Sequence, residues 1–444
     1  MRNDKTTLRD LSIFSSDGGG IFGLIDHTTT HNGREALRKL AHQPPASPEA
    51  LQELQDTVRF WTEHPDSWPE IISNGTLVML EKFFEAANTA APAPGDISLL
   101  FGTFMQKFLN RSEYFFTQFS VSHIADFLKG CRQLCESAGG QAPALLQREL
   151  EAMRRELAHP LTDEVVAVGP DTPYKIMARI SHRVRREMKP VILRLIQHYA
   201  RIDAWQSLAR ATLHQGWHFP VLLPENPMRF EAEGLFHPLL GNPTAYTIAF
   251  GQSRNFLVLT GANMSGKTTF MRAMGVAAFL GHIGAGVPAA AMKMSFLEGI
   301  ITNMHVEDNL LRGESYFFAE VQRMKQTAEK LIQPRAHLVL MDELFKGTNV
   351  HDAYECTRAV MEGLLKRPGH LMILSTHIYE AAQHFSDREG ILFACFVTQL
   401  SEDNSYRFTY ELRPGISNDR IGYRILQQAG VLDLLSSGTN FPER

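Results

Sequence analysis

The 444-residue chain has few cysteines, little net charge and no long uninterrupted apolar run. Its four cysteines, Cys131, Cys135, Cys356 and Cys395, exclude a disulfide scaffold and favour a reducing compartment. Lys and Arg total 44 against 48 Asp and Glu, so any surface that binds nucleic acid must be a local patch. The 44% hydrophobic and 21% charged content excludes a disordered or collagen-like chain and is typical of a globular protein.

Membrane and secretion signals are also missing. The longest apolar stretch, residues 271–292, contains Arg272, His282, Pro288 and four glycines, which indicates a buried helix and turn instead of a membrane span. The first residues lead into no apolar run of signal-peptide length. We therefore expect a cytoplasmic protein.

The residue pattern changes near residue 216. Before it, apolar residues recur at helical spacing, and residues 216–243 then contain five prolines, a density that no helix tolerates. After it, three short apolar runs at 256–259, 338–341 and 371–374 are each followed by a helical pattern, which predicts a parallel sheet covered on both faces. The predicted fold class is α + α/β, with an all-α domain over 1–215 and an α/β domain over 216–444.

The first apolar run continues into a loop that matches G-x-x-x-x-G-K-[ST] over residues 261–268. Such glycines let main-chain N–H groups surround a phosphate, and the helix that follows adds the positive end of its dipole. In this motif the lysine binds the β- and γ-phosphates, and the hydroxyl of the last residue is a ligand of Mg²⁺. The predicted nucleotide-binding residues are Gly261, Asn263, Met264, Ser265, Gly266, Lys267, Thr268 and Thr269.

Polar residues at the ends of the other two runs extend this prediction. Asp342 is expected to bind Mg²⁺ with Thr268, and Glu343 to orient and deprotonate the attacking water, the alternative being an acid pair at a helix N-terminus. His377 is expected to reach the γ-phosphate, the alternative being a structural histidine. Tyr246 is a candidate for stacking on the adenine, with packing as the alternative.

Taken together, these motifs resemble those of the MutS family of DNA mismatch-repair ATPases, a branch of the ABC-type nucleotide-binding fold. The family's P-loop is close to TGPNMGGKST, its Walker B stretch to LVLMDE followed by RGT, and its switch to ATH; the similar segments here are 260–268, 338–348 and 375–377. Residues 313–320 are similar to the signature segment G-x-STF-x-x-E, and residues 414–431 to the family's C-terminal segment. Residues 7–37 resemble the start of its helical lever domain.

The resemblance implies a P-loop ATPase domain with ATP and Mg²⁺ as cofactors, and supports catalytic roles for Lys267, Glu343 and His377. Ser315, the signature serine, would complete the site of the opposite subunit, which implies a homodimer through the ATPase domains. Glu314 and Tyr316 depart from the family pattern. The resemblance also implies a lever domain whose clamp is absent or reduced, without the family's mismatch-recognition and connector domains.

A basic stretch between residues 175 and 201 is the candidate DNA-binding surface. Phosphate contacts need only cations at roughly helical spacing, and the candidates are Arg179, Arg183, Arg186 and Lys189. The alternative is a solvated helix face paired with acidic residues elsewhere in the fold.

The expected function is an ATP-hydrolysing, MutS-like conformational switch that binds DNA by its backbone or shape in repair or recombination. Such a protein would be cytoplasmic and associated with the nucleoid. One alternative is an ATP-binding scaffold or adaptor, favoured by Glu314 and disfavoured by Glu343. Another is a MutS relative that acts on structured RNA or ribosomes.

Overall fold

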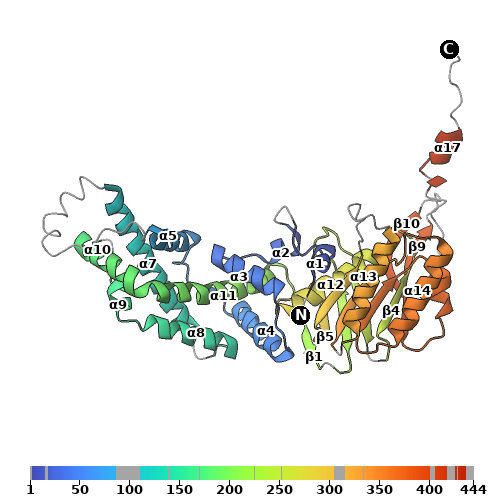
Figure 1. The fold of residues 1–444 in the computed structure, drawn as a ribbon, viewed down its shortest axis with the longest axis horizontal. Helices are drawn as coiled ribbons and strands as arrows, with labels where there is room; N and C mark the ends of the chain where they lie inside the picture. The colour runs from blue at the N-terminus through green and yellow to red at the C-terminus, as the bar shows by residue number, and fades with distance from the viewer. Residues whose placement is uncertain are drawn as a thin grey trace, which may run out of the picture. The chain divides into compact units, whose positions relative to one another are not determined.

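The chain forms two compact units in the computed structural model (Figure 1). The sheet unit comprises Met1–Leu24, His42–Leu51 and Gln215–Arg444, and the helical unit comprises Ile25–Ala41 and Gln52–His214. The residues that the structure describes are 3–15, 19–86, 111–138, 141–169, 171–224, 226–251, 253–304, 316–333, 335–400, 406–417, 426–427 and 429–436.

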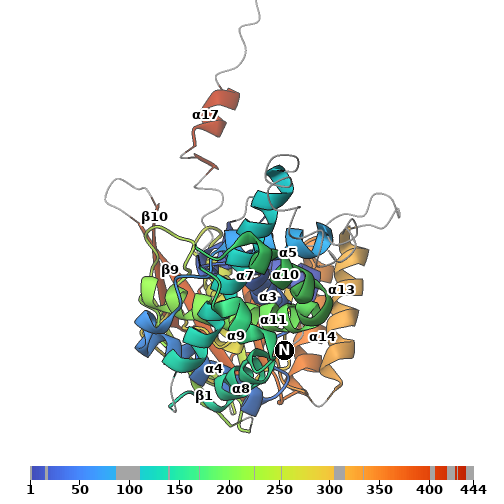
Figure 2. The ribbon, with the colours of Figure 1, turned by 90° about the vertical axis from the view of Figure 1, so that its left-hand side faces the viewer.

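The helical unit is built from helices packed side by side (Figure 2). Most of them are amphipathic, whereas α11 is buried all round from Ile202 to Ala209. In α8, for example, Leu146, Leu150, Met153 and Leu157 are buried at three- and four-residue spacing, as the sequence pattern predicts. Helix α7 packs against α5, α8, α9 and α10, and α8 packs against α11. The helices are α3 (His31–His42), α4 (Pro48–Glu63), α5 (Asn74–Glu85), α7 (Arg111–Ser137), α8 (Ala144–Leu157), α9 (Leu161–Val166), α10 (Tyr174–Arg183) and α11 (Lys189–His214).

A buried carboxylate of α11 binds the first segment of this unit. Asp203 of α11 is fully buried and accepts hydrogen bonds of 2.6–3.0 Å from the main-chain N–H and hydroxyl groups of Thr29 and Thr30. A Cβ on Gly33 would lie 2.0 Å from the Asp203 carboxylate, so this position admits only glycine. Burial raises the pKa of Asp203, and the four donors oppose that rise.

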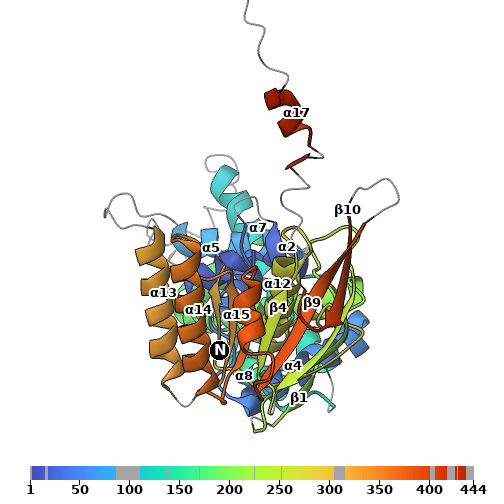
Figure 3. The same ribbon diagram turned by 90° about the vertical axis from the view of Figure 1, so that its right-hand side faces the viewer.

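The sheet unit contains a six-stranded sheet with the order β10-β9-β4-β8-β7-β6 (Figure 3). All pairs are parallel except β10 with β9. The three apolar runs of the sequence are β4, β7 and β8, and every residue of these strands is buried, which confirms the predicted parallel sheet. Its strands are β4 (Phe256–Thr260), β6 (Gly299–Asn303), β7 (His337–Asp342), β8 (Leu371–Ser375), β9 (Ile391–Leu400) and β10 (Tyr406–Pro414).

A second, four-stranded sheet with the order β1-β5-β2-β3 was not predicted from the sequence. Its β1 and β2 lie in the proline-rich segment after residue 216, where the prolines fall in the loops before and after the strands. Two of its three pairings are antiparallel. The strands are β1 (Val221–Leu223), β2 (Arg229–Leu235), β3 (Tyr246–Gly251) and β5 (Ala291–Ser295).

Helices cover both faces of the six-stranded sheet. On one face lie α13, α14 and α15 (Figure 3). Met324 of α13, Met361 of α14 and Phe385, directly after α15, are buried in a common core with residues of β4, β7 and β8. On the other, α12 packs against β6, β7, β8 and also β2. The helices of this unit are α1 (Lys5–Asp10), α2 (Gly20–Ile25), α12 (Lys267–His282), α13 (Tyr316–Leu331), α14 (Val350–Leu365), α15 (Tyr379–His384) and α17 (Val431–Ser436).

The N-terminal helix α1 packs on strand β6 within the sheet unit. Thr302 of β6 donates a 2.7 Å hydrogen bond to Asp10, and Asp4 forms ion pairs of 3.2 and 3.1 Å with Arg323 and Lys330 of α13. The compact units therefore place Met1–Leu24 with the C-terminal part of the chain, whereas the domain prediction assigned residues 1–215 to the helical domain. That functional division stays a prediction.

The apolar stretch 271–292 forms most of α12, whose residues from Ala273 to His282 are all buried, followed by a turn, as predicted. In the described part of the chain, no helix combines the length and apolar character that crossing a membrane requires. His282, at the end of α12, uses both ring nitrogens: Nδ1 lies 2.7 Å from the Ala278 carbonyl oxygen, and Nε2 accepts a 2.8 Å hydrogen bond from Leu297 N–H. Burial lowers the pKa of His282 from 6.5 to about 4.

We expect the free energy of unfolding of the His282→Gln variant to fall less than that of wild type as the pH is lowered. Because the folded-state pKa of His282 lies below the unfolded value, its contribution is complete above pH 6.5 and disappears as the pH falls toward 4. Between pH 7 and pH 5 the loss amounts to on the order of 2 kcal/mol in the free energy of unfolding. Urea denaturation at pH 7 and pH 5 measures it, and the exposed His31→Gln is the control. Identical pH dependence in wild type and His282→Gln would contradict this assignment.

Candidate functional site

The glycine-rich loop joins the buried strand β4 to helix α12. Gly261 and Gly266 have φ angles of +137° and +108°, and Met264 between them has +68°. A Cβ on Gly261 would lie 3.0 Å from the Phe396 carbonyl oxygen, so both its conformation and its surroundings require glycine. Gly266 caps α12, which places the free N–H groups of the first helical turn beside the loop.

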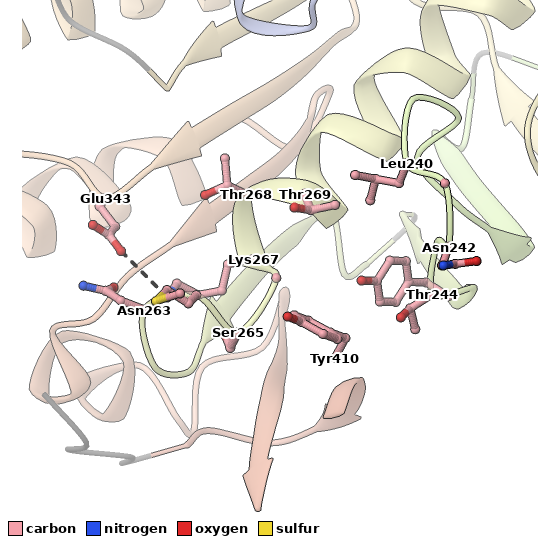
Figure 4. Close-up of a pocket in the computed structure, with 14 residues that line it drawn as sticks. Leu240, Asn242, Thr244, Asn263, Ser265, Lys267, Thr268, Thr269, Glu343 and Tyr410 are labelled. Carbon is pink, nitrogen blue, oxygen red and sulfur yellow. Dashed lines mark ion pairs between the residues drawn. The ribbon is translucent and has the colours of Figure 1, made fainter. Parts of the chain in front are cut away.

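Lys267, the first residue of α12, spans this loop with its side chain. Its Nζ donates hydrogen bonds of 2.9 and 3.0 Å to the carbonyl oxygens of Gly261 and Ala262, and lies 3.7 Å from Glu343 Oε1 (Figure 4). Burial lowers the pKa of Lys267, whereas the carboxylates of Glu343 and Asp342 act in the opposite direction. The ammonium group therefore lies between the loop and two acidic side chains.

Asp342 is the last residue of β7, and its carboxylate accepts hydrogen bonds from hydroxyl groups of two other elements. Thr268 of α12 donates a 2.6 Å hydrogen bond to Oδ2, and Ser375 at the end of β8 donates a short one to Oδ1. The next helix begins only at Val350, so Asp342 and Glu343 are not an acid pair at a helix N-terminus. The parallel arrangement of β4, β7 and β8 brings these polar groups to one edge of the sheet.

Glu343 follows with a φ of +55°, and its N–H donates a 3.0 Å hydrogen bond to the Ser375 carbonyl oxygen. Its Oε2 lies 3.1 Å from Lys346 Nζ and 3.7 Å from His377 Nδ1. Burial raises the pKa of Glu343, but the positive charges of Lys346 and Lys267 hold it below its usual value. The carboxylate is therefore ionised and surrounded by basic groups.

A pocket of about 610 Å³ opens beside this cluster (Figure 4). Tyr246 lines it, but the ring is only 5% exposed and meets Phe270 and Phe396 edge-on at 5.2 and 5.9 Å, so its adenine-stacking role stays a prediction. Tyr410 of β10 lines the same pocket, is 43% exposed and has a φ of +55°. The lining residues are Leu240, Gly241, Asn242, Thr244, Tyr246, Asn263, Met264, Ser265, Gly266, Lys267, Thr268, Thr269, Glu343 and Tyr410.

All predicted catalytic and metal-binding residues therefore lie near this pocket, from Lys267 and Thr268 to Asp342, Glu343 and His377. Ser315 and the adjacent Glu314 lie outside the described residues.

Sequence reasoning did not propose four contributors to the site. Ser375 and Lys346 contact Asp342 and Glu343, Tyr410 lines the pocket, and the carboxylate of Glu320 on α13 binds the loop after Glu343. For Ser375, Lys346 and Glu320 a signal existed, because each stands inside a segment that resembles a family motif. Tyr410 gave no signal.

The candidate DNA-binding residues lie in the helical unit, on α10, α11 and the π-helical turn Val184–Met188 between them. Arg183 forms ion pairs of 2.8 and 3.5 Å with Glu164 and Glu187, and Lys189 lies 5.8 Å above the ring of Phe84. Two other arginines of the stretch, Arg194 and Arg201, pair with Glu156 and Glu149. Much of the basic stretch is thus matched by acids, and its DNA contacts stay a prediction.

Comparison with known proteins identifies the region that contains this site. Residues 257–437 match the family model of MutS domain V. The chain is similar to the DNA mismatch repair protein MutS of Lawsonia intracellularis, with 29% identity over 265 residues, 57% of this chain and 29% of that protein. It is similar to the MutS of Thermotoga maritima, with 29% identity over 255 residues, 56% of this chain and 31% of that protein.

The chain thus matches less than a third of the length of these relatives. The matched region begins in β4 and ends after α17, so it includes the glycine-rich loop, Asp342, Glu343, His377 and Tyr410. The α/β sheet, the order of the motifs and the family model all indicate the same domain. Residues 257–437, which contain this site, therefore form a MutS domain V.

Proposed function

We propose that the chain binds ATP with Mg²⁺ in this pocket and hydrolyses it to ADP and phosphate. The observation that supports this best is the convergence on Asp342 and Glu343: Thr268 contacts the first at 2.6 Å and Lys267 the second at 3.7 Å, both from the start of α12. A phosphate on the loop would lie beside the ammonium group, the hydroxyl and both carboxylates.

The residues fit a magnesium ion that is shared with phosphate. The Thr268 hydroxyl and the Asp342 carboxylate are hard oxygen ligands held 2.6 Å apart. Within the described residues, no cluster of three or more His, Cys, Asp or Glu side chains could hold a metal ion alone. This is the expected arrangement for Mg²⁺, which takes one or two protein oxygens and completes its shell with water and substrate phosphates. When bound, the ion would neutralise charge on the phosphates.

In the proposed reaction the chain's own groups have separate tasks. The loop N–H groups hold the phosphates, and Lys267 exchanges its carbonyl partners, Gly261 and Ala262, for phosphate oxygens. Glu343 orients a water molecule and accepts its proton while the water oxygen bonds to the γ-phosphorus and the bond to the ADP oxygen breaks. His377, 3.7 Å from Glu343, orients that carboxylate and contacts the γ-phosphate.

The Glu343→Gln variant is expected to bind ATP but to lose hydrolysis. The amide keeps the shape of the side chain and cannot accept the proton, so kcat should fall by at least about 100-fold. Equilibrium binding of ATP and steady-state phosphate release measure the two properties. Glu411→Gln, an exposed glutamate on β10, is the matched control. Only a trace of turnover, equal in wild type and Glu343→Gln, would favour the scaffold or adaptor.

We also propose that the adenine packs on Tyr410, the more exposed of the two tyrosines in the pocket. Tyr410→Ala should raise the Kd for ATP about tenfold, because stacking of a base on an aromatic ring is lost. Tyr410→Phe keeps the ring and should bind like wild type. Binding of inorganic triphosphate, which has no base, should be equal in all three proteins. A Kd for ATP that is unchanged in Tyr410→Ala would exclude this placement.

For the whole protein we propose a nucleotide-driven switch on DNA, active as a homodimer in which Ser315 completes the opposite site. The relatives' name, DNA mismatch repair protein, supports a DNA partner, although the match covers less than a third of them. A cytoplasmic, nucleoid-associated location belongs to the same proposal. Action on structured RNA or ribosomes is the second candidate among nucleic acids.

The DNA proposal predicts that DNA stimulates ATP hydrolysis. Matched, mismatched and branched duplexes and a structured RNA are compared at fixed salt. Removal of two cations in Arg179→Ala/Arg186→Ala should weaken the stimulation and its salt dependence, whereas Arg155→Ala, 81% exposed on α8, should not. Stimulation by RNA alone would support the second candidate, and indifference to every nucleic acid would contradict both.

A further inference from the structure

A buried carboxylate on helix α13 binds the loop that follows Glu343. Glu320, 8% exposed, accepts a 3.0 Å hydrogen bond from the N–H of Lys346 at Oε1 and a 3.1 Å hydrogen bond from the N–H of Gly347 at Oε2. We call this pair of hydrogen bonds the Glu320 clasp. A buried carboxylate needs such donors, and hydrogen bonds to a charged acceptor are stronger than neutral ones.

The same loop touches the first turn of α13 at two further points. A Cβ on Gly347 would lie 2.7 Å from both the main-chain nitrogen of Phe317 and the ring of Tyr316, so the glycine lets the two segments approach. The rings of Phe317 and Phe345 lie 6.0 Å apart, and Phe345 is only 4% exposed. The loop and the start of α13 are thus packed as one body.

This loop also sets the position of the proposed catalytic base. Glu343 and Phe345 have φ angles of +55° and +60°, and a non-glycine residue keeps this conformation only where its surroundings hold it. Lys346, whose N–H is held by Glu320, places its Nζ 3.1 Å from Glu343 Oε2. If the Glu320 clasp is displaced, Lys346 moves with it and shifts the Glu343 carboxylate.

We propose that Glu320 is a positioning residue that couples α13 to Glu343, so that the position of α13 sets the hydrolytic competence of the site. The inference rests on the proposed ATPase function and deepens it. Helix α13 begins at Tyr316, directly after Ser315 in the sequence. A change at that end of α13 is thereby transmitted to the Glu343 carboxylate of the same chain.

Two variants perturb the clasp from opposite sides. Glu320→Gln replaces one acceptor oxygen with an amide that faces a main-chain N–H, and Gly347→Ala forces the loop away from Phe317. The matched controls are Glu329→Gln, an exposed glutamate on α13, and Gly363→Ala, an α14 position where an added Cβ meets no atom within 4 Å. All are made in the full chain, and thermal unfolding verifies that each folds.

Both clasp variants should exchange the amide hydrogens of Lys346 and Gly347 faster than wild type in the absence of nucleotide. They should lower kcat for ATP by on the order of 10- to 100-fold, as expected for a misplaced catalytic group. The KM should change by less than about twofold, because the phosphate-binding loop is untouched. The double variant should be no slower than the slower single variant, since both changes break one linkage.

A purely structural role would lower the unfolding temperature and leave kcat per folded molecule unchanged. Faster amide exchange with wild-type kcat in both variants, or multiplicative losses in the double variant, would overturn the coupling. The proposed function fails in a different way, through the absence of Glu343-dependent turnover in the wild-type protein.

Discussion

The carboxylate of Asp342 is the point on which the geometry of the site depends. It accepts hydrogen bonds from the hydroxyl groups of Thr268 and Ser375, which are 74 and 33 residues away in the sequence. One side chain thereby joins the start of α12 to the ends of β7 and β8. The arrangement is possible because three buried parallel strands end in register at one edge of the sheet, where main-chain polar groups no longer need a strand partner.

From that edge outward, the site is held by increasingly local interactions. Lys267 and Glu343 take their positions from the loop and strand ends, and the left-handed conformation of Glu343 turns its side chain into the pocket beside the glycine-rich loop. The positive charge of Lys346 helps to keep this carboxylate ionised despite burial, and His377 lies 3.7 Å from it. Lys267 and Glu343 are thus positioned by strand ends, whereas Lys346 and His377 are positioned by loops that lead into helices.

The sequence predicts the six-stranded sheet and the loop because uninterrupted apolar runs and fixed motif spacing are local properties. It does not predict the four-stranded sheet, since β1 and β2 are short, lie among prolines and pair with the distant β5. Glu320 and Tyr410 join the site only through tertiary contact: Glu320 binds a main-chain group 26 residues away, and Tyr410 lines the pocket together with the distant glycine-rich loop. Charge counting likewise could not reveal that Arg183 pairs with Glu164, 19 residues earlier.

The contact of α1 with β6 bears on how this chain resists self-association. Strand β6 is the outer strand of the six-stranded sheet, and such a strand offers unpaired N–H and carbonyl groups to any other strand. Here the Ile300 N–H bonds to the Asn3 side chain, and the Ile300 carbonyl oxygen accepts from the Thr7 hydroxyl. Residues 3–10 thus cover this edge, and their removal would expose a template for intermolecular β-pairing and aggregation.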